Sequence, residues 1–373
     1  MSTIYRNLPR PMLVADYEEA VSLAVETLSR IPGISAVYRF GTLWQPGVSD
    51  IDLLVVCDEG AEPAIPGPWR LSPKAAYLFT HRYLTMGVDS AQELFALFPE
   101  ETLRCQFLWG TEVDFRKPKD ELSPAEYSWM IAGVFFDMLV TKLLPLAGVI
   151  PLMKDVDVRQ RIGQLHSLKY SEILLHVLQE DFTCDTAFTE QVDLLYEHWF
   201  AAPKQEQLDL LEDVSLQAVS VIMGMVECFK HYTDTYVSDC VPLCFRSGRY
   251  TIRFTDVWSP KEFAHIYRRG FVRLGKFHHD TLLTPQTFGV FLTWYAAHGG
   301  AFGMRVRESI RSVSCVSPAP AGFLRHADAL NAAFADYEYS HGTHKIPYTF
   351  GFSPGGGWPE RVKKWVTYPF MVV

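Results

Sequence analysis

Two aspartates, Asp50 and Asp52, stand one residue apart at the start of a short apolar run that is rich in branched side chains. Such a run is typical of a buried strand, in which successive side chains point to opposite faces of the sheet. The two carboxylates then share one face, while Ile51 and Leu53 face the core. Neighbouring carboxylates repel each other unless a cation lies between them, and their oxygens suit Mg²⁺. The spacing therefore predicts a magnesium site.

A Gly-Thr pair, Gly41 and Thr42, lies just upstream, at the end of a second apolar run over residues 36–40. Glycine lets backbone amides come close to a phosphate group, and the threonine hydroxyl can donate a hydrogen bond to one of its oxygens. The pair therefore predicts a phosphate contact beside the two aspartates.

This order of strand, Gly-Thr, short connection and strand bearing Asp-x-Asp resembles the nucleotidyltransferase superfamily of the DNA polymerase beta type. The likeness is greatest to the minimal and aminoglycoside nucleotidyltransferases, in which a Ser-Asp-Ile-Asp-Leu stretch such as residues 49–53 is common and a helical domain follows. It covers roughly residues 14–115. The resemblance implies that Asp50 and Asp52 hold two Mg²⁺ ions, and that Gly41, Thr42 and Ser49 bind the nucleotide.

Two features of the superfamily are missing from this stretch. Active members usually have a third carboxylate on the next strand, but the strand expected over residues 75–86 carries no acid. Asp114 folding back, or His81 standing in place of the acid, would complete the site, and we assign Asp114 as the third catalytic carboxylate. Many relatives also have a basic residue soon after the Gly-Ser or Gly-Thr pair, whereas residues 43–46 contain none.

The cation for the triphosphate is therefore expected from the helical region. A helix predicted over residues 155–179 places His166, Lys169 and His176 close to one face. We assign Lys169 to the nucleotide site. The competing interpretation is a solvated helix face, because mixed charge on a helix is ordinary.

Two functions follow from these residues and the resemblance. The first is a metal-dependent enzyme that moves a nucleoside monophosphate from a nucleoside triphosphate, with ATP the expected donor, to a hydroxyl of a small-molecule or protein acceptor. The second is a catalytically lapsed binding or regulatory protein, which the missing third acid and the missing basic residue favour.

The elements around these residues predict an α+β fold. A helix over residues 16–30, capped by Asp16, precedes the strands, and a further strand is expected at residues 106–109. We divide the chain into a nucleotidyltransferase domain with a mixed sheet, an all-helical domain, and a mixed C-terminal region that includes helices at residues 260–275 and 285–298. The boundaries are residues 1–120, 121–235 and 236–373.

Composition narrows the setting. The chain has 373 residues, a net charge of -9 and seven scattered cysteines, which favours a reducing, cytoplasmic protein and makes a long nucleic acid an unfavourable partner. Residues 129–153 are nearly long enough to cross a bilayer, but Asp137, Lys142 and Pro145 interrupt them. We expect a buried helix there and no membrane association.

Overall fold

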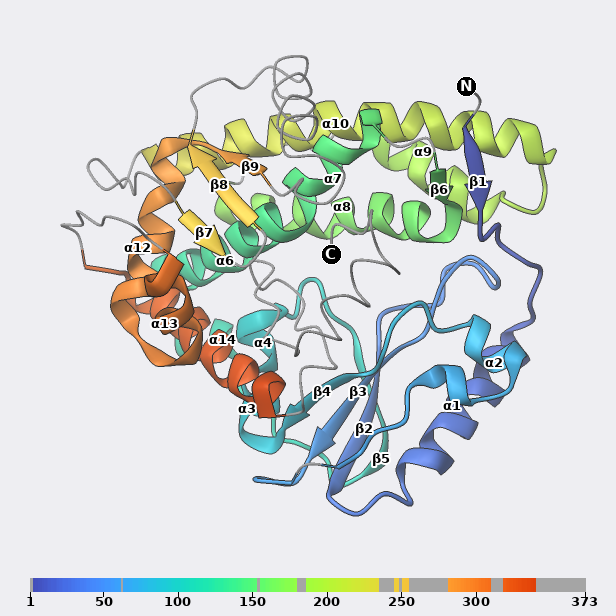
Figure 1. Ribbon diagram of the computed structural model, residues 1–373, viewed down its shortest axis with the longest axis horizontal. Helices are drawn as coiled ribbons and strands as arrows, with labels where there is room; N and C mark the ends of the chain where they lie inside the picture. Colours follow the sequence, from blue (N-terminus) through green and yellow to red (C-terminus); the bar gives the residue numbers. More distant parts are fainter. Residues whose placement is uncertain are drawn as a thin grey trace.

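The chain folds as a mixed α+β protein that is mostly helical and contains a small mixed sheet, in agreement with the expected class. In Figure 1 the long helices lie at the top and the four-stranded sheet lies at the bottom. The computed structural model describes residues 3–61, 63–152, 155–179, 186–234, 245–247, 250–254, 281–309 and 318–339.

Four strands form the sheet that carries the two aspartates. In spatial order they are β4 (Leu84–Gly87), β3 (Asp52–Cys57), β2 (Ile34–Phe40) and β5 (Cys105–Gly110). β3 runs parallel to β4, and β2 runs antiparallel to both β3 and β5. Phe40 pairs with Asp52 on one side and with Cys105 on the other. The end of β2 and the starts of β3 and β5 therefore meet at one edge of the sheet.

Both faces of β3 are covered, because its side chains alternate between two cores. Leu53 and Val55 are buried in the core that includes the two helices on the outer face, whereas Leu54 and Val56 belong to the large core shared with the helical region. The outer helices, on the right of the sheet in Figure 1, are α1 (Val14–Leu28) and α2 (Pro73–Tyr77). By the same alternation Asp52 faces the helical side.

The helical region is built on one long segment that changes its hydrogen-bond pattern midway. α6 (Pro124–Met138) continues through a π-helical turn, η2 (Leu139–Leu143), into α7 (Leu144–Val149). Ser123 begins the segment with a capping box, since its hydroxyl accepts from the Glu126 amide while the Glu126 carboxylate accepts from the Ser123 amide.

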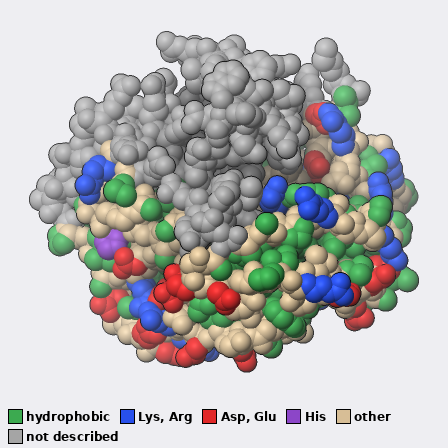
Figure 2. Space-filling model, turned by 60° about the horizontal axis from the view of Figure 1, so that its bottom comes forward, with side chains coloured by type: hydrophobic (Ala, Val, Ile, Leu, Met, Phe, Trp, Pro, Cys, Tyr) green, Lys and Arg blue, Asp and Glu red, His purple; other side chains and the backbone are tan. Residues whose placement is uncertain are grey.

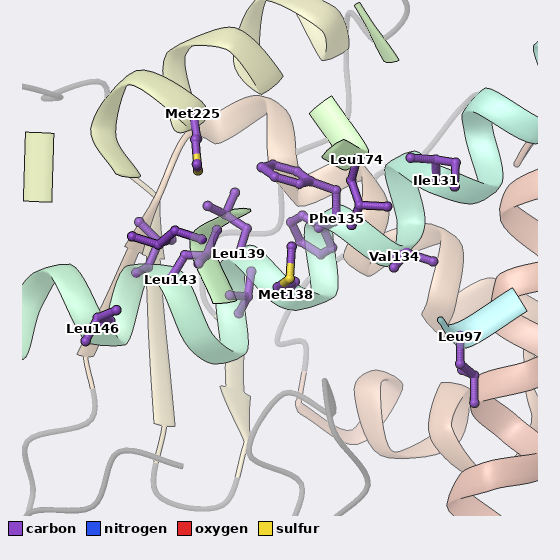
Figure 3. Packing of buried hydrophobic residues seen from close by; sticks show 14 of the residues in the cluster. Leu97, Ile131, Val134, Phe135, Met138, Leu139, Leu143, Leu146, Leu174 and Met225 are labelled. Atoms are coloured by element: carbon purple, nitrogen blue, oxygen red, sulfur yellow. The ribbon is translucent and has the colours of Figure 1, made fainter. Parts of the chain in front are cut away.

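Two further helices, α8 (Val158–Leu178) and α10 (Lys204–Asp234), pack on this segment, and α9 (Thr186–Glu197) packs on both of them. In Figure 3 Met225 points from α10 toward Leu139, and Phe135 of α6 lies in the same buried cluster as Leu174 of α8. The apolar stretch that is nearly long enough to cross a bilayer thus contributes its side chains to a protein core. No helix among the described residues is long and apolar enough to cross a bilayer.

Shorter elements connect these parts or lie toward the C-terminus. β1 (Ile4–Arg6) pairs in parallel with β6 (Asp155–Asp157), which directly precedes α8. The remaining elements are η1 (Pro68–Arg70), α3 (Val88–Gln92), α4 (Leu94–Leu97), α5 (Pro118–Glu121), η3 (Ile150–Leu152), β7 (Phe245–Ser247), β8 (Tyr250–Phe254), β9 (Thr281–Thr284), η4 (Gln286–Phe288), α12 (Gly289–His298), α13 (Gly300–Ser309) and α14 (Ala321–Tyr339).

The strand predicted over residues 75–86 is wrong for most of its length. Ser72 caps a short helix there, because its hydroxyl accepts from the Ala75 amide and Pro73 occupies the first helical position. The strand begins only at Leu84. The expected cap at Asp16 also differs, since Asp16 lies in the first turn of α1 and accepts from the Leu13 amide. The helix expected at residues 260–275 lies outside the described residues.

A buried histidine attaches α14 to the rest of the helical region. The Nε2 atom of His326 lies 2.9 Å from Oδ2 of Asp137 on α6, and its Nδ1 atom lies 2.8 Å from the Ala96 carbonyl oxygen of α4. Both side chains are almost fully buried. Burial raises the pKa of Asp137 to about 6 against the opposing effect of His326. The contact therefore joins three helices through groups that have little access to water.

We expect Asp137→Ala to lower the free energy of unfolding by about 3–5 kcal/mol, because it leaves His326 buried without its acidic partner. Asp328→Ala is the matched control: Asp328 pairs with His298 at 2.6 Å, but its side chain is 66% exposed, so the loss should stay below about 1 kcal/mol. Urea denaturation measures both. Equal losses would contradict the role given to the buried pair.

Candidate functional site

Asp50, Asp52 and His81 come together at the edge of the sheet where β2 ends and β3 begins. One ligand atom from each of the three side chains lies within 4.8 Å of the others. Asp52 is the first residue of β3, and His81 lies on the connection between α2 and β4. The amide of Ile51 donates to the Leu78 carbonyl oxygen at 2.9 Å, which holds this connection against the start of β3. His81, one of the two side chains that were expected from sequence to complete the site, therefore lies beside the predicted aspartate pair.

Each side chain of the cluster is oriented by a neighbour. The Thr80 hydroxyl donates to Oδ2 of Asp50. The Nε2 atom of His81 lies 2.5 Å from Oδ1 of Asp52, and its Nδ1 atom lies 2.6 Å from the Arg82 carbonyl oxygen. Because a carbonyl oxygen can only accept, Nδ1 carries a proton and donates it to Arg82. The imidazole ring is thus fixed with Nε2 toward the carboxylates.

The charges of the cluster act strongly on one another. Burial and the nearby Asp52 raise the pKa of Asp50. Burial opposes ionisation of Asp52 as well, but His81, and more weakly Lys142 and Arg39, outweigh it and lower the pKa of Asp52. Burial disfavours charge on His81, yet Asp52 raises the pKa of His81 to about 9. An imidazolium therefore neutralises one of the two carboxylates when no other cation does so.

Residues 41–49, between β2 and β3, are held by buried hydroxyl and guanidinium groups. The Tyr17 hydroxyl of α1 accepts from the Gly47 amide at 2.9 Å and donates to the Ser49 carbonyl oxygen at 2.6 Å. The Tyr77 hydroxyl donates to the Gly47 carbonyl oxygen at 2.8 Å. Arg159 of α8 donates to the carbonyl oxygens of Tyr77 at 2.6 Å and Ser49 at 3.3 Å. Neither tyrosine was predicted to belong to the site, because no sequence motif marks them.

Gly41 lies directly beside the aspartate pair. Its φ of +70° is a left-handed conformation that favours glycine, and a side chain built there would begin 3.9 Å from Oδ2 of Asp52. Its amide donates to the Arg104 carbonyl oxygen at 2.9 Å, and this hydrogen bond continues the pairing of β2 with β5. The position is as predicted, but the amide is already engaged.

Thr42 and Ser49 have different environments. Thr42 is exposed and lines an open groove of about 360 Å³ with α1 residues, Arg39 and Arg104, on the outer side of the sheet. Ser49 is buried, and its hydroxyl accepts from the amides of Trp44 at 3.2 Å and Gln45 at 3.1 Å. Ser49 therefore shapes the loop and its assignment as a nucleotide contact stays a prediction, whereas Thr42 lines a space that a ligand can enter.

Asp114 lies on the connection that follows β5. The Val113 amide donates to the Tyr38 hydroxyl at 2.6 Å, and the centre of the Phe115 ring lies 5.1 Å from that of Tyr38. Tyr38 is buried in the same core as Leu54, so this connection lies over the face of the sheet that Asp52 also occupies. The group of Asp50, Asp52 and His81 does not include Asp114, and its role as the third catalytic carboxylate stays a prediction.

Two lysines of the helical region lie near the site. Lys169 of α8 lies 5.2 Å from the ring centre of Trp44, within the loop that precedes Asp50, but its ammonium group is paired with Asp193 of α9. Lys142 lies on the π-helical turn η2, is exposed, and acts on the charge of Asp52. From sequence, Lys142 was only a charge that interrupts an apolar stretch. Its place near Asp52 was not predicted, because the π-helical turn that carries it has no sequence signature.

His166 of α8 is buried in an aromatic setting next to the same loop. Its ring centre lies 5.3 Å from that of Trp44 and 4.8 Å from that of Tyr196. Burial, with a smaller effect of Lys169, lowers the pKa of His166 to about 4. The side chain is therefore neutral at physiological pH and contributes packing.

Comparisons of the chain with protein-family models, curated proteins and solved structures give no match.

We expect His166 to make stability depend on pH. Its pKa is about 4 in the folded chain and 6.5 in an unfolded one, so only the unfolded chain binds the proton between these values. The free energy of unfolding therefore keeps the full contribution of neutral His166 above pH 6.5. It falls by about 3 kcal/mol as the pH is lowered from 6.5 toward 4. Urea denaturation at several pH values should show a smaller loss for His166→Gln. Identical pH profiles would exclude this origin.

Proposed function

We propose that this protein is a metal-dependent nucleotidyltransferase, which moves a nucleoside monophosphate from a nucleoside triphosphate to the hydroxyl of an acceptor. The observation that carries the proposal is the position of Asp50 and Asp52 at the start of β3, beside the left-handed Gly41 turn that ends β2. That arrangement agrees with the resemblance of residues 40–56 to the superfamily of the DNA polymerase beta type. A cytoplasmic location belongs to the same proposal, and a free thiol such as that of Cys105 fits a reducing compartment.

The carboxylates suit divalent cations, because they share one face and are held by hydrogen bonds from Thr80 and His81. Two bound Mg²⁺ ions would offset the charge of the triphosphate and favour in-line attack by the acceptor hydroxyl. Asp50 and Asp52 fix the position of that charge. Thr42, exposed at the sheet edge, can donate a hydrogen bond to a phosphate oxygen.

Cations for the phosphate groups are available from both parts of the fold. Arg39 and Lys142 act on Asp52, and Arg104 lines the groove beside Thr42. On the face shown in Figure 2, lysines and arginines of the described residues are interspersed with acidic and apolar side chains rather than gathered in a band. The described part of this face therefore offers no continuous basic band to a long polyanion.

The alternative is a binding or regulatory protein that has lost catalysis. It is favoured by the group of Asp50, Asp52 and His81, which does not include Asp114, and by the pairing of Lys169 with Asp193. Such a protein would bind nucleotide and metal without releasing pyrophosphate. Incubation of the purified protein with each radiolabelled nucleoside triphosphate and Mg²⁺, followed for binding and for pyrophosphate, distinguishes the two.

Asp50→Asn and Asp52→Asn should each abolish pyrophosphate release, by a factor of at least 10³, because one remaining carboxylate cannot bridge the cations. Asp114→Asn makes the same chemical change at an acid outside the group of Asp50, Asp52 and His81 and should retain activity close to that of the unaltered protein.

The variants must keep the melting temperature of the parent for this comparison to hold. Activity that persists in both site variants, or that disappears in Asp114→Asn alone, would contradict the proposed site.

Lys142→Ala should raise the KM for the nucleotide about tenfold or more, since it removes a cation that acts on Asp52. Lys169→Ala should have a smaller effect, because the ammonium of Lys169 is paired with Asp193. Initial rates over a range of nucleotide concentrations measure both. The reverse order would restore Lys169 as the phosphate contact assigned from sequence.

A further inference from the structure

The donor set of the cluster contains a nitrogen. Two of its ligand atoms are carboxylate oxygens, from Asp50 and Asp52, and the third belongs to the imidazole of His81. Mg²⁺ prefers oxygen ligands and keeps several waters, whereas imidazole suits transition ions. The chemical identity of the third side chain therefore bears on which cation the site selects.

The hydrogen bonds of His81 are those of a metal-binding histidine. Its Nδ1 atom donates to the Arg82 carbonyl oxygen at 2.6 Å, which fixes the ring and leaves Nε2 as the atom that faces the carboxylates. Histidines that bind metals usually hold their other ring nitrogen in this way, against a carbonyl or a carboxylate. The Thr80 hydroxyl does the same for Asp50. Asp50 and His81 are thus oriented by groups outside the cluster.

The position of His81 also suits a cation that must be reached from solvent. Its side chain is 54% exposed and that of Asp52 is 36% exposed, although both lie at the edge of a buried sheet. A site with three protein donors on one side and solvent on the other leaves positions for water or for a ligand.

We propose that Asp50, Asp52 and His81 form a site for a divalent first-row transition ion, bound through Nε2 of His81 and the two carboxylates in preference to Mg²⁺. This inference rests on the metal site of the proposed function, but it does not depend on transfer of a nucleotide. It gives His81 a direct bond to the cation, in the place where an acid was expected from sequence.

Mn²⁺ is the probe for the test. Titration of the full chain with Mn²⁺, followed by the electron paramagnetic resonance of the free ion, gives its affinity, and competition gives that of Mg²⁺. Pulsed measurements on bound Mn²⁺ should detect coupling to an imidazole ¹⁴N nucleus. His81→Asn should remove the coupling and weaken Mn²⁺ binding at least tenfold. His81→Asp, which makes all donors oxygen, should remove the coupling and lower the preference for Mn²⁺ over Mg²⁺ at least tenfold.

His298→Asn is the control, because it alters a histidine–aspartate pair of the helical region and should leave coupling and affinity unchanged. Weak or absent Mn²⁺ binding by the parent, a spectrum without ¹⁴N coupling, or an unchanged affinity in His81→Asn would each overturn the inference. Transfer activity with Mg²⁺ but no nitrogen coupling would overturn it while leaving the proposed function intact. Nitrogen coupling without any transfer would support it and count against the enzyme.

Discussion

The side chain of Arg159, on α8, places a positive charge beside the loop that precedes β3, and only 4% of the residue's surface is exposed. Burying such a charge costs several kcal/mol unless strong acceptors and nearby negative charge compensate it. The carbonyl oxygens of Tyr77 and Ser49 accept its hydrogen bonds, its guanidinium lies 4.1 Å from the Tyr77 ring centre, and its charge helps to keep Asp50 ionised. The loop before β3, helix α2 and the helical region therefore share one contact, at the residue that directly precedes Asp50.

The aspartate pair was predictable because the alternation of a strand is a local rule. Residues 51–56 alternate between two cores as expected, and Asp50 and Asp52 accordingly share a face. The strands at residues 36–40 and 106–109, and the helices of the central region, were also predicted in the right places. Each of these carries its signal within a few residues of sequence.

The site residues that could not be predicted depend on the direction of the strands and on which residues pair between them. The apolar residues 75–83 suit a strand or a helix equally well, so His81 was placed within a strand, whereas the loop conformation is what lets its ring turn toward Asp52. The position of Asp114 depends on the direction of β5, which runs antiparallel to β2, and the sequence does not state that direction. Lys142 and Arg159 reach the sheet from distant helices, and only the packing of those helices decides which of several cations arrive.

The pairing of β1 with β6 bears on the order in which the chain folds. Arg6 and Asp155, which form an ion pair across these strands, are 149 residues apart in sequence. At ribosomal rates of 5–20 residues per second, β1 waits about 7 to 30 s for its partner during synthesis. The strands β2 to β5 and helix α1 can form in that interval, since their contacts close shorter loops. β1 therefore pairs late, and its pairing with β6 connects an already formed sheet to the helices that follow it.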